Sequence, residues 1–441
     1  MFVHPRSDRF ASEPARVRRP AWQFIWRVLG RIAVVTLIAL VSAPLLPLFA
    51  LGVARWGWPP HQPRLPDVAR YLGYAASERP AAPGIAPLSR VWLTVRVIEA
   101  AFLIPIHGVA WFLDELLFAR AMRETPVVAP LIMLSAARSG STQTGRYLEQ
   151  DPSLAAPSVL QCVFPYLWLW RLLPAGIERI FTRDRVRRMF RRMTTVEFLE
   201  RHEGDPYLTD TLEILFFALR SSLISPLFGP RVMAEEFAFG GKSAAVRRIW
   251  EVDFVEYLDR LGRKSLLFAA RRDSGAAPHT ARRLFVKGHF LDSRDALAER
   301  YPDAHFLSVV RDPVARLRSV LNHLHGNPFD EALGALPWSW ITAAAVDAET
   351  AYCDVEKAWF SRERGPKRTV VRFGDFVADL EGTMRTVYRR CLGVERLPSH
   401  VPREHVPRER KKYVVNRTLE EAGVDRAALV ARVVDYREWC R

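Results

Sequence analysis

The stretch PLIMLSAARSGSTQTGRYLE, residues 130–149, decides the fold class of this sequence. It opens with a short apolar run, Pro130 to Ser135, continues through a loop of small residues, and takes up helical composition from Ser141 to Glu149. This order predicts a strand, a loop and a helix. Small residues in such a loop let successive backbone N–H groups close around an oxyanion at the helix N-terminus. Plain helix capping without a ligand is the alternative.

The order of a strand followed by a helix recurs three times towards the C-terminus. The predicted pairs are a strand at Arg283 to Lys287 with a helix at Ser293 to Tyr301, a strand at His305 to Arg311 with a helix at Pro313 to His323, and a strand at Arg368 to Phe373 with a helix ending at Leu392. This alternation predicts an α/β fold, a P-loop-like parallel sheet flanked by helices, with ligands at the carboxyl ends of the strands. Residues 152–280 break the rhythm and are predicted to form a helical insertion over the sheet.

The composition is that of a folded, basic protein. The 441 residues carry a net charge of +16, and 49% of them are hydrophobic, so the chain lacks the signature of disorder. The four cysteines lie far apart, which gives no indication of a disulfide framework or a zinc site, and no metal is expected. The excess of arginine favours phosphate, sulfate or anionic lipid, because guanidinium holds oxyanions in a bidentate fork. Nucleic acid is disfavoured, because no zinc-finger, bZIP or RNP pattern is present.

An apolar segment near the N-terminus predicts a membrane anchor. No residue is charged from Ile32 to Ala54, and a bilayer core takes about 20 apolar residues of helix. Pro44 and Pro47 favour a kinked or re-entrant helix as much as a straight one. The residues before Ile32 are rich in arginine, which places the N-terminus in the cytoplasm.

A second apolar stretch runs from Val91 to Ala119. It carries the charged or titratable residues Arg96, Glu99, His107, Asp114 and Glu115. An interfacial or hairpin-returning helix is predicted, and a buried helix of the globular domain is the alternative. Residues 55–90 between the two stretches are interpreted as a connecting loop. The chain is therefore predicted to divide into a membrane-anchoring part, 1–125, and an α/β domain, 126–441.

The loop after the first strand matches the nucleotide-binding pattern G-x-x-x-x-G-K-[ST] only in part. Ser135 replaces the first Gly, and Ser141 stands where the Lys should be, so the lysine that reaches a γ-phosphate is missing. The nearest cation is Arg138, two residues before Gly140. A P-loop kinase or ATPase is therefore disfavoured against a protein that binds a 5′-phosphate carrying some other group.

A second cation follows another predicted strand. Arg311 ends its strand, and Pro313 opens a helix at a favoured first position, so Arg311 and Ser319 can converge on one anion. The alternative is a solvated helix start with Arg316 and Arg318 exposed.

Lys287 and His289 point to the same side at the end of the strand that begins at Arg283, because strand side chains alternate. A lone histidine is more often structural. One that lies two residues from a lysine at a strand's carboxyl end is a better candidate for acid/base chemistry.

The segments LSAARSGSTQTGRYL, VKGHF and FLSVVRDPVARLRSVLNH, in this order, resemble the bacterial, membrane-associated type of sulfotransferase that uses 3′-phosphoadenosine 5′-phosphosulfate (PAPS). The resemblance covers residues 130–425 and implies in-line transfer of SO₃ from a phosphate leaving group, without a metal. It implies that the first loop holds the 5′-phosphosulfate through Ser139, Gly140, Ser141 and Thr142. It also implies that Arg311 and Ser319 hold the 3′-phosphate.

The resemblance assigns the remaining roles as well. His289 would take the acceptor's proton, while Lys287 and Arg138 would stabilise charge on the leaving group. Glu213, in the insertion, is a spare candidate base, with an ordinary helix-surface carboxylate as the favoured interpretation. The basic run that contains Arg408 and Arg410 is similar to the closing segment of bacterial members and is expected to contribute to the donor site.

The acceptor is predicted to be a hydroxyl of a lipid-linked or carbohydrate molecule. Val159 to Leu173, which is aromatic, and Arg179 to Arg192, which is basic, have the composition of a membrane-facing surface; core packing and a solvated helix face are the alternatives. Because PAPS is cytosolic, residues 130–441 are expected on the cytoplasmic face, held by a hairpin or re-entrant anchor, with membrane lipid as a partner. A non-catalytic protein that binds anionic lipid would leave the three loop segments unexplained. The oligomeric state stays open.

Overall fold

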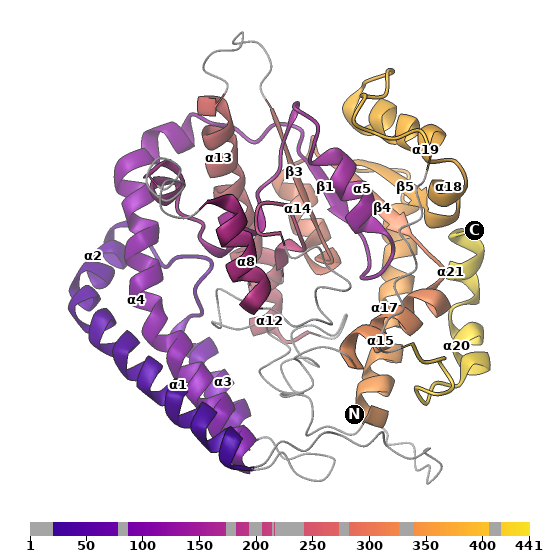
Figure 1. Ribbon diagram of the computed structural model, residues 1–441. Coiled ribbons are helices and arrows are strands. Elements are labelled where there is room, and N and C mark those ends of the chain that lie inside the picture. The colour runs from indigo at the N-terminus through magenta and orange to yellow at the C-terminus, as the bar shows by residue number, and fades with distance from the viewer. Residues whose placement is uncertain are drawn as a thin grey trace.

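The computed structural model describes residues 21–77, 87–172, 182–193, 205–213, 216, 242–272, 282–325, 338–404 and 416–441. Figure 1 shows a central sheet with helices on both faces and a separate flank of N-terminal helices at the left of the view. The predicted residues Arg408 and Arg410 lie outside the described residues.

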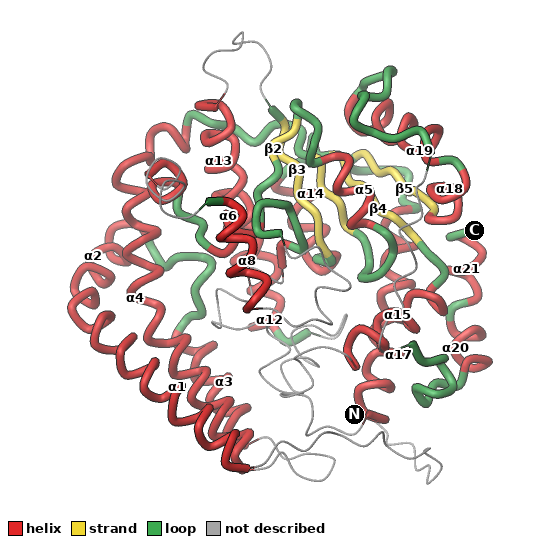
Figure 2. Tube along the Cα trace, in the orientation of Figure 1, coloured by secondary structure: helices red, strands yellow, loops and turns green. Residues whose placement is uncertain are grey.

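The sheet has five strands, all parallel, in the order β2-β3-β1-β4-β5 (Figure 2). Their bounds are β1 (Leu131–Leu134), β2 (Leu154–Ala155), β3 (Arg283–Gly288), β4 (His305–Val310) and β5 (Lys367–Arg372). The four predicted strands are confirmed to within two residues at each end. The edge strand β2 was not predicted, because a strand of two residues shows no periodicity, and it lies inside the stretch taken for a helical insertion.

Alternate side chains of the strands build two separate cores. Ile132, Leu134 and Val286 belong to a cluster on one face that reaches α4 (Pro87–Arg123), α13 (Phe254–Arg272) and α17 (Trp338–Phe360). Leu131 and Met133 belong to the cluster on the other face, which reaches α5 (Ser141–Leu148) and α19 (Leu380–Val387). Every residue of β1 is fully buried, as expected for a central strand of a parallel sheet covered on both faces.

A helix follows each long strand. α5 follows β1, η5 (Leu291–Ser293) and α14 (Arg294–Arg300) follow β3, and α15 (Pro313–His325) follows β4. After β5 the predicted single helix is broken into α18 (Phe373–Ala378), α19 and η6 (Tyr388–Leu392). The break is at Asp379, whose side chain accepts a hydrogen bond from the Gly382 N–H and so caps α19.

The predicted insertion contains α6 (Val159–Val163), α8 (Arg183–Met193), α12 (Ala244–Arg248), the π-helical turn η4 (Ile249–Asp253) and α13 in its described parts. Tyr166, Leu167 and Trp170 are buried in the main core. The aromatic stretch 159–173 therefore packs largely into the core over its described residues, which favours the alternative of core packing, whereas Phe164 and Leu172 are 41% and 66% exposed. At the C-terminus, α20 (Arg426–Arg432) and α21 (Val434–Trp439) pack beside α15 and α17.

The N-terminal flank consists of α1 (Ala21–Ser42), a 3₁₀ turn η1 (Ala43–Leu45), α2 (Leu46–Trp56), α3 (Leu65–Ser77) and α4. The turn η1 contains Pro44, and Pro47 follows at the start of α2, so the prolines interrupt the apolar helix as predicted for a kink. Residues 55–90 are not simply a connecting loop, because they contain α3. The stretches Val28–Trp56 and Thr94–Arg123 are long and apolar enough to cross a membrane.

The two apolar helices run parallel to each other. Ser42 Oγ donates to the carbonyl of Phe102, Phe49 packs on Gly108, and Gly52 packs on Phe112, so position along α1–α2 rises together with position along α4. The arms of a hairpin are antiparallel. The predicted hairpin of these two segments is therefore wrong, because α3 returns the chain between them.

Four charged residues of α4, Arg96, Glu99, Asp114 and Glu115, are buried in the protein. Asp114 forms a fully buried ion pair with Lys264 of α13 at 2.9 Å and accepts hydrogen bonds from the N–H groups of Leu167 and Trp168 at 2.7 and 2.8 Å. Glu115 pairs with Arg260, also of α13. The second apolar stretch is thus a helix of the globular domain, as the alternative interpretation held.

Candidate active site

The loop between β1 and α5 has the backbone conformation of an anion-binding turn. Arg138 and Gly140 both adopt positive φ angles, 64° and 100°. A Cβ atom at Gly140 would lie 2.5 Å from the ring of Phe373, so both the conformation and the space require glycine there. Gly140 is the N-cap of α5, and its carbonyl accepts from the Gln143 N–H at 3.1 Å, whereas the N–H groups of Ser141 and Thr142 have no acceptor within the helix. The loop therefore directs backbone donors towards one point at the carboxyl end of β1.

Ser135 joins three strands at this point. Its N–H donates to the Gly288 carbonyl at 3.1 Å, and its hydroxyl accepts from the Val309 N–H at 2.9 Å. Its own carbonyl lies 2.5 Å from Nδ1 of His289. The residue in the place of the first P-loop glycine thus fixes the ends of β1, β3 and β4 relative to one another.

Two hydroxyls beside the loop are buried without a hydrogen-bond partner in the described structure. Ser139 and Thr144 are both 0% exposed, and the side-chain oxygens of both lack a partner. A buried hydroxyl without a partner costs free energy, about 1–3 kcal/mol. A phosphate oxygen held by the loop would supply the partner that the Ser139 hydroxyl lacks.

The two predicted oxyanion segments meet. Arg138 Nε donates to Ser319 Oγ at 2.9 Å, across 181 residues of sequence, and Arg311 Nη1 donates to the Arg138 carbonyl at 3.1 Å. The Arg311 guanidinium lies 4.5 Å from the centre of the Phe373 ring. Burial and the nearby Arg138 charge lower the pKa of Arg311. Two cations this close favour an anion between them. Arg138 belongs to the first loop and also donates a hydrogen bond to Ser319, so it connects the two segments.

A buried charge network fixes the helix that carries Ser319. Arg316 is 0% exposed and donates to Glu349 at 2.6 Å, to Glu356 at 3.4 Å and to the Tyr436 hydroxyl at 3.1 Å. These partners lie on α17 and α21. The alternative interpretation expected both Arg316 and Arg318 to be exposed. It is wrong for Arg316 and correct for Arg318.

Lys287 and His289 lie at the carboxyl end of β3, next to the loop. Lys287 is 3% exposed and pairs with Asp210 at 3.5 Å. A Cβ atom at Gly145 would lie 2.8 Å from Lys287 Cδ, so the lysine stem packs directly on α5. Since a carbonyl can only accept, Nδ1 of His289 carries the proton in the bond to Ser135, which leaves the lone pair of the neutral ring on Nε2. That is the tautomer a general base needs.

Glu213 reaches the same strand end. Its side chain is 3% exposed, its Oε2 has no hydrogen-bond partner, and a Cβ atom at Gly288 would overlap that oxygen. Burial raises the pKa of Glu213 to about 8, opposed by the backbone N–H groups of Glu213 and His289 and by the Lys287 charge. The favoured interpretation of Glu213 as a surface carboxylate is wrong.

Two residues at this site, Asp210 and Phe373, were not predicted from the sequence. Asp210 is the acidic partner of Lys287, and Phe373 sets the close approach at Gly140 and stacks under Arg311. Phe373 directly follows β5, so its place at a strand's carboxyl end was an available signal. Asp210 lies in a segment without a clear pattern, and no signal in the sequence singled it out.

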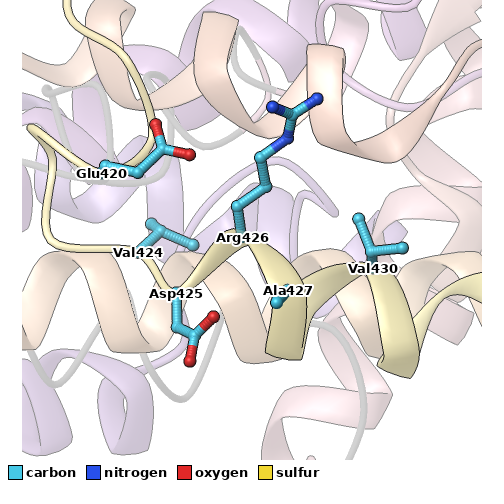
Figure 3. A pocket seen from close by; sticks show the side chains of 6 residues that line it. All are labelled: Glu420, Val424, Asp425, Arg426, Ala427 and Val430. Atoms are coloured by element: carbon cyan, nitrogen blue, oxygen red, sulfur yellow. The ribbon is translucent and has the colours of Figure 1, made fainter.

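A metal site is not evident in the residues that the structure describes. No group of three His, Cys, Asp or Glu side chains there could hold a metal ion. An open depression of about 540 Å³ lies at the C-terminal helix α20 and shares no residue with the loops described above (Figure 3). It is lined by Glu420, Val424, Asp425, Arg426, Ala427 and Val430.

Fold and site together define a P-loop-like α/β protein without a P-loop lysine, in which the Arg138–Ser319 hydrogen bond joins the two groups predicted to bind oxyanions. Residues 130–397 match the model of the sulfotransferase family, and the chain belongs to this family. Two solved structures share the fold. Sulfotransferase STF9 from Mycobacterium avium has a TM-score of 0.59 at 17% identity, over 89% of this chain and 95% of its own. Sulfotransferase STF1 from Mycobacterium tuberculosis H37Rv has a TM-score of 0.55 at 16% identity, over 88% of this chain and 98% of its own. No curated protein matches the sequence.

Proposed function

We propose that this protein transfers a sulfuryl group from PAPS to a hydroxyl of a lipid-linked or carbohydrate acceptor. The observation that carries the proposal is the hydrogen bond between Arg138 and Ser319, because it joins the β1–α5 loop to the segment that begins at Arg311. A donor with phosphates at its 5′ and 3′ positions needs two oxyanion groups at neighbouring strand ends. The partnerless hydroxyl of Ser139 fits the same ligand.

The residues divide into a 5′ group and a 3′ group. The backbone of Gly140, Ser141 and Thr142, with the Ser139 hydroxyl, would hold the 5′-phosphosulfate at the N-terminus of α5. Arg311 and Ser319 would hold the 3′-phosphate, with Arg138 between the two. PAPS, when bound, supplies an activated sulfuryl group whose leaving group is a phosphate.

The proton of the acceptor hydroxyl needs a base at the same strand ends. His289 is the proposed base, since its bond to Ser135 places the proton of the neutral ring on Nδ1 and the lone pair on Nε2. Lys287, held against α5, would place its charge near the bridging oxygen as negative charge develops there. Glu213, with its raised pKa, is protonated over much of the neutral range, so it is the weaker candidate base.

A transfer assay tests the proposal and identifies the acceptor class. Purified full-length protein is incubated with sulfur-labelled PAPS and with lipid and carbohydrate extracts in parallel, and Arg311→Ala is the control. Label in the organic phase would identify a lipid-linked acceptor, and label in the aqueous phase a carbohydrate. The proposal would be contradicted if protein that binds the bisphosphate product transferred no label to either extract. We also propose that the site faces the cytoplasm, where PAPS is available.

A further inference from the structure

The helices α1 and α2 present an apolar outer face to solvent. It is defined by Leu29, Leu37, Leu40, Leu46, Leu48 and Leu51, each at least 49% exposed. Figure 1 shows these helices, in indigo, along the outer flank of the molecule, with α4 between them and α13. The most apolar 18 residues of Val28–Trp56 have a mean hydropathy of 2.5, and 17% of them are buried. The corresponding values within Thr94–Arg123 are 1.5 and 50%. Monomeric soluble proteins rarely expose an apolar surface of this extent.

Close contacts attach α1–α2 lengthwise to α4. In two places a phenylalanine of one helix packs on a glycine of the other. The Phe112 ring of α4 covers Gly52 of α2, and the Phe49 ring of α2 covers Gly108 of α4. A side chain at either glycine would overlap the opposing ring. Arg31 of α1 also pairs with Glu99 of α4 at 2.7 Å. The apolar helices therefore lie along the flank of the protein instead of projecting from it.

α4 is in turn held to the α/β domain by buried charges. The Asp114–Lys264 and Glu115–Arg260 pairs both join α4 to α13, and Arg263 donates to the carbonyls of Met122 and Thr125. A bilayer crossed by α1–α2 in this arrangement would have to accept α4 and its charged residues, which is costly in hydrocarbon. Because α1–α2 and α4 are parallel, they also cannot form the two arms of a membrane hairpin.

We propose that α1–α2 is an in-plane anchor, with its outer face seated in one leaflet of an anionic bilayer and α4 between the lipid and the α/β domain. The helices would then lie on the membrane without crossing it. This inference goes beyond the proposed function and does not depend on it.

The residues around the outer face fit a lipid surface better than a protein. Trp26 and Trp56 lie near the two ends of α1–α2 and are 67% and 37% exposed, and tryptophan is enriched at membrane interfaces. Exposed Arg55, at the end of α2, lies with its guanidinium 5.9 Å from the Trp56 ring. Arginines at the border of an apolar face attract anionic headgroups. A second copy docked on the same face would meet a chain of net charge +16.

Vesicle flotation tests whether the outer face binds lipid. Full-length protein is mixed with phosphatidylcholine vesicles with and without phosphatidylglycerol. Leu40→Asp should weaken partitioning into the vesicles by about tenfold or more, because a carboxylate on the outer face would have to enter the lipid. Val434→Asp is the matched control, since Val434 is 47% exposed on α21, and it should bind like the wild type. Equal vesicle binding by Leu40→Asp and the wild type would overturn the proposal. It would also be overturned if the wild type formed a dimer in solution and Leu40→Asp dissociated that dimer without changing flotation.

Depth measurements distinguish an in-plane helix from a spanning one. The four native cysteines are buried, so the single variants Leu29→Cys, Leu40→Cys and Leu51→Cys can each carry one fluorophore. Quenching by lipids labelled at different acyl depths should place all three probes at the same shallow depth. A deep probe at Leu40 with shallow probes at Leu29 and Leu51 would show a crossing helix and overturn the proposal.

Discussion

Replacement of Ser319 by alanine tests how the donor's two ends are distinguished. In the structure Ser319 Oγ accepts a hydrogen bond from Arg138 Nε, so the substitution removes one proposed phosphate contact and one support of Arg138. A hydrogen bond to a charged group contributes about 1.5–3 kcal/mol, which corresponds to a loss of about 10- to 100-fold in affinity for the 3′,5′-bisphosphate product. Adenosine 5′-phosphosulfate, which lacks the 3′-phosphate, should bind Ser319→Ala almost as it binds the wild type.

Titration calorimetry with both ligands measures this difference directly. Arg318→Ala is the matched control, because Arg318 precedes Ser319 on the same helix, is exposed, and donates to Arg417 and Asn416. Its affinity for both ligands should stay within about twofold, as expected for an exposed residue away from the site. Equal losses for the two ligands in Ser319→Ala would refute the assignment of Ser319 to the 3′-phosphate.

Three further predictions concern His289, Glu213 and Arg316. His289→Ala should keep product affinity and lower the single-turnover rate by about 10²- to 10⁴-fold; a normal rate in protein of unchanged melting temperature would move the base elsewhere. The contribution of Glu213 to wild-type stability should fall as pH rises from 4.5 to about 8, because Glu213 holds its proton in the folded state over a range in which it loses it on unfolding. Glu213→Gln should flatten that part of the curve of melting temperature against pH, and parallel curves would contradict the raised pKa. Arg316→Leu should lower the free energy of unfolding by about 3–5 kcal/mol in urea titrations, because Glu349 and Glu356 lose their buried cation; a loss below about 1 kcal/mol would show that the network is not coupled as described.

The sheet and the meeting of the two loops were predictable because their signals are local. β1 is a short apolar run that is buried on both faces, so its pattern needed no knowledge of distant residues. Arg311 and Ser319 were predicted to converge because a strand and a helix fix the spacing between them. Their meeting with Arg138 follows from β1 and β4 being neighbours in the sheet.

The remaining features depend on partners far away in the sequence. Arg316 is buried because acidic residues 33 and 40 positions later come to it on α17, and nothing near Arg316 shows this. The burial of Glu213 likewise depends on contact with the end of β3. The direction of α4 against α1–α2 could not be read from hydropathy, because hydropathy reports the length of an apolar segment and not its neighbours.

The central claim is that the joined loops bind a nucleotide with both 5′ and 3′ phosphates. Competition between 3′-phosphoadenosine 5′-phosphate and ATP for the full-length protein tests it most directly. We predict tight binding of the bisphosphate, weak binding of ATP, and loss of the preference in Arg311→Ala. Preferential binding of ATP by the wild-type protein would contradict the account and favour a nucleotide kinase or ATPase.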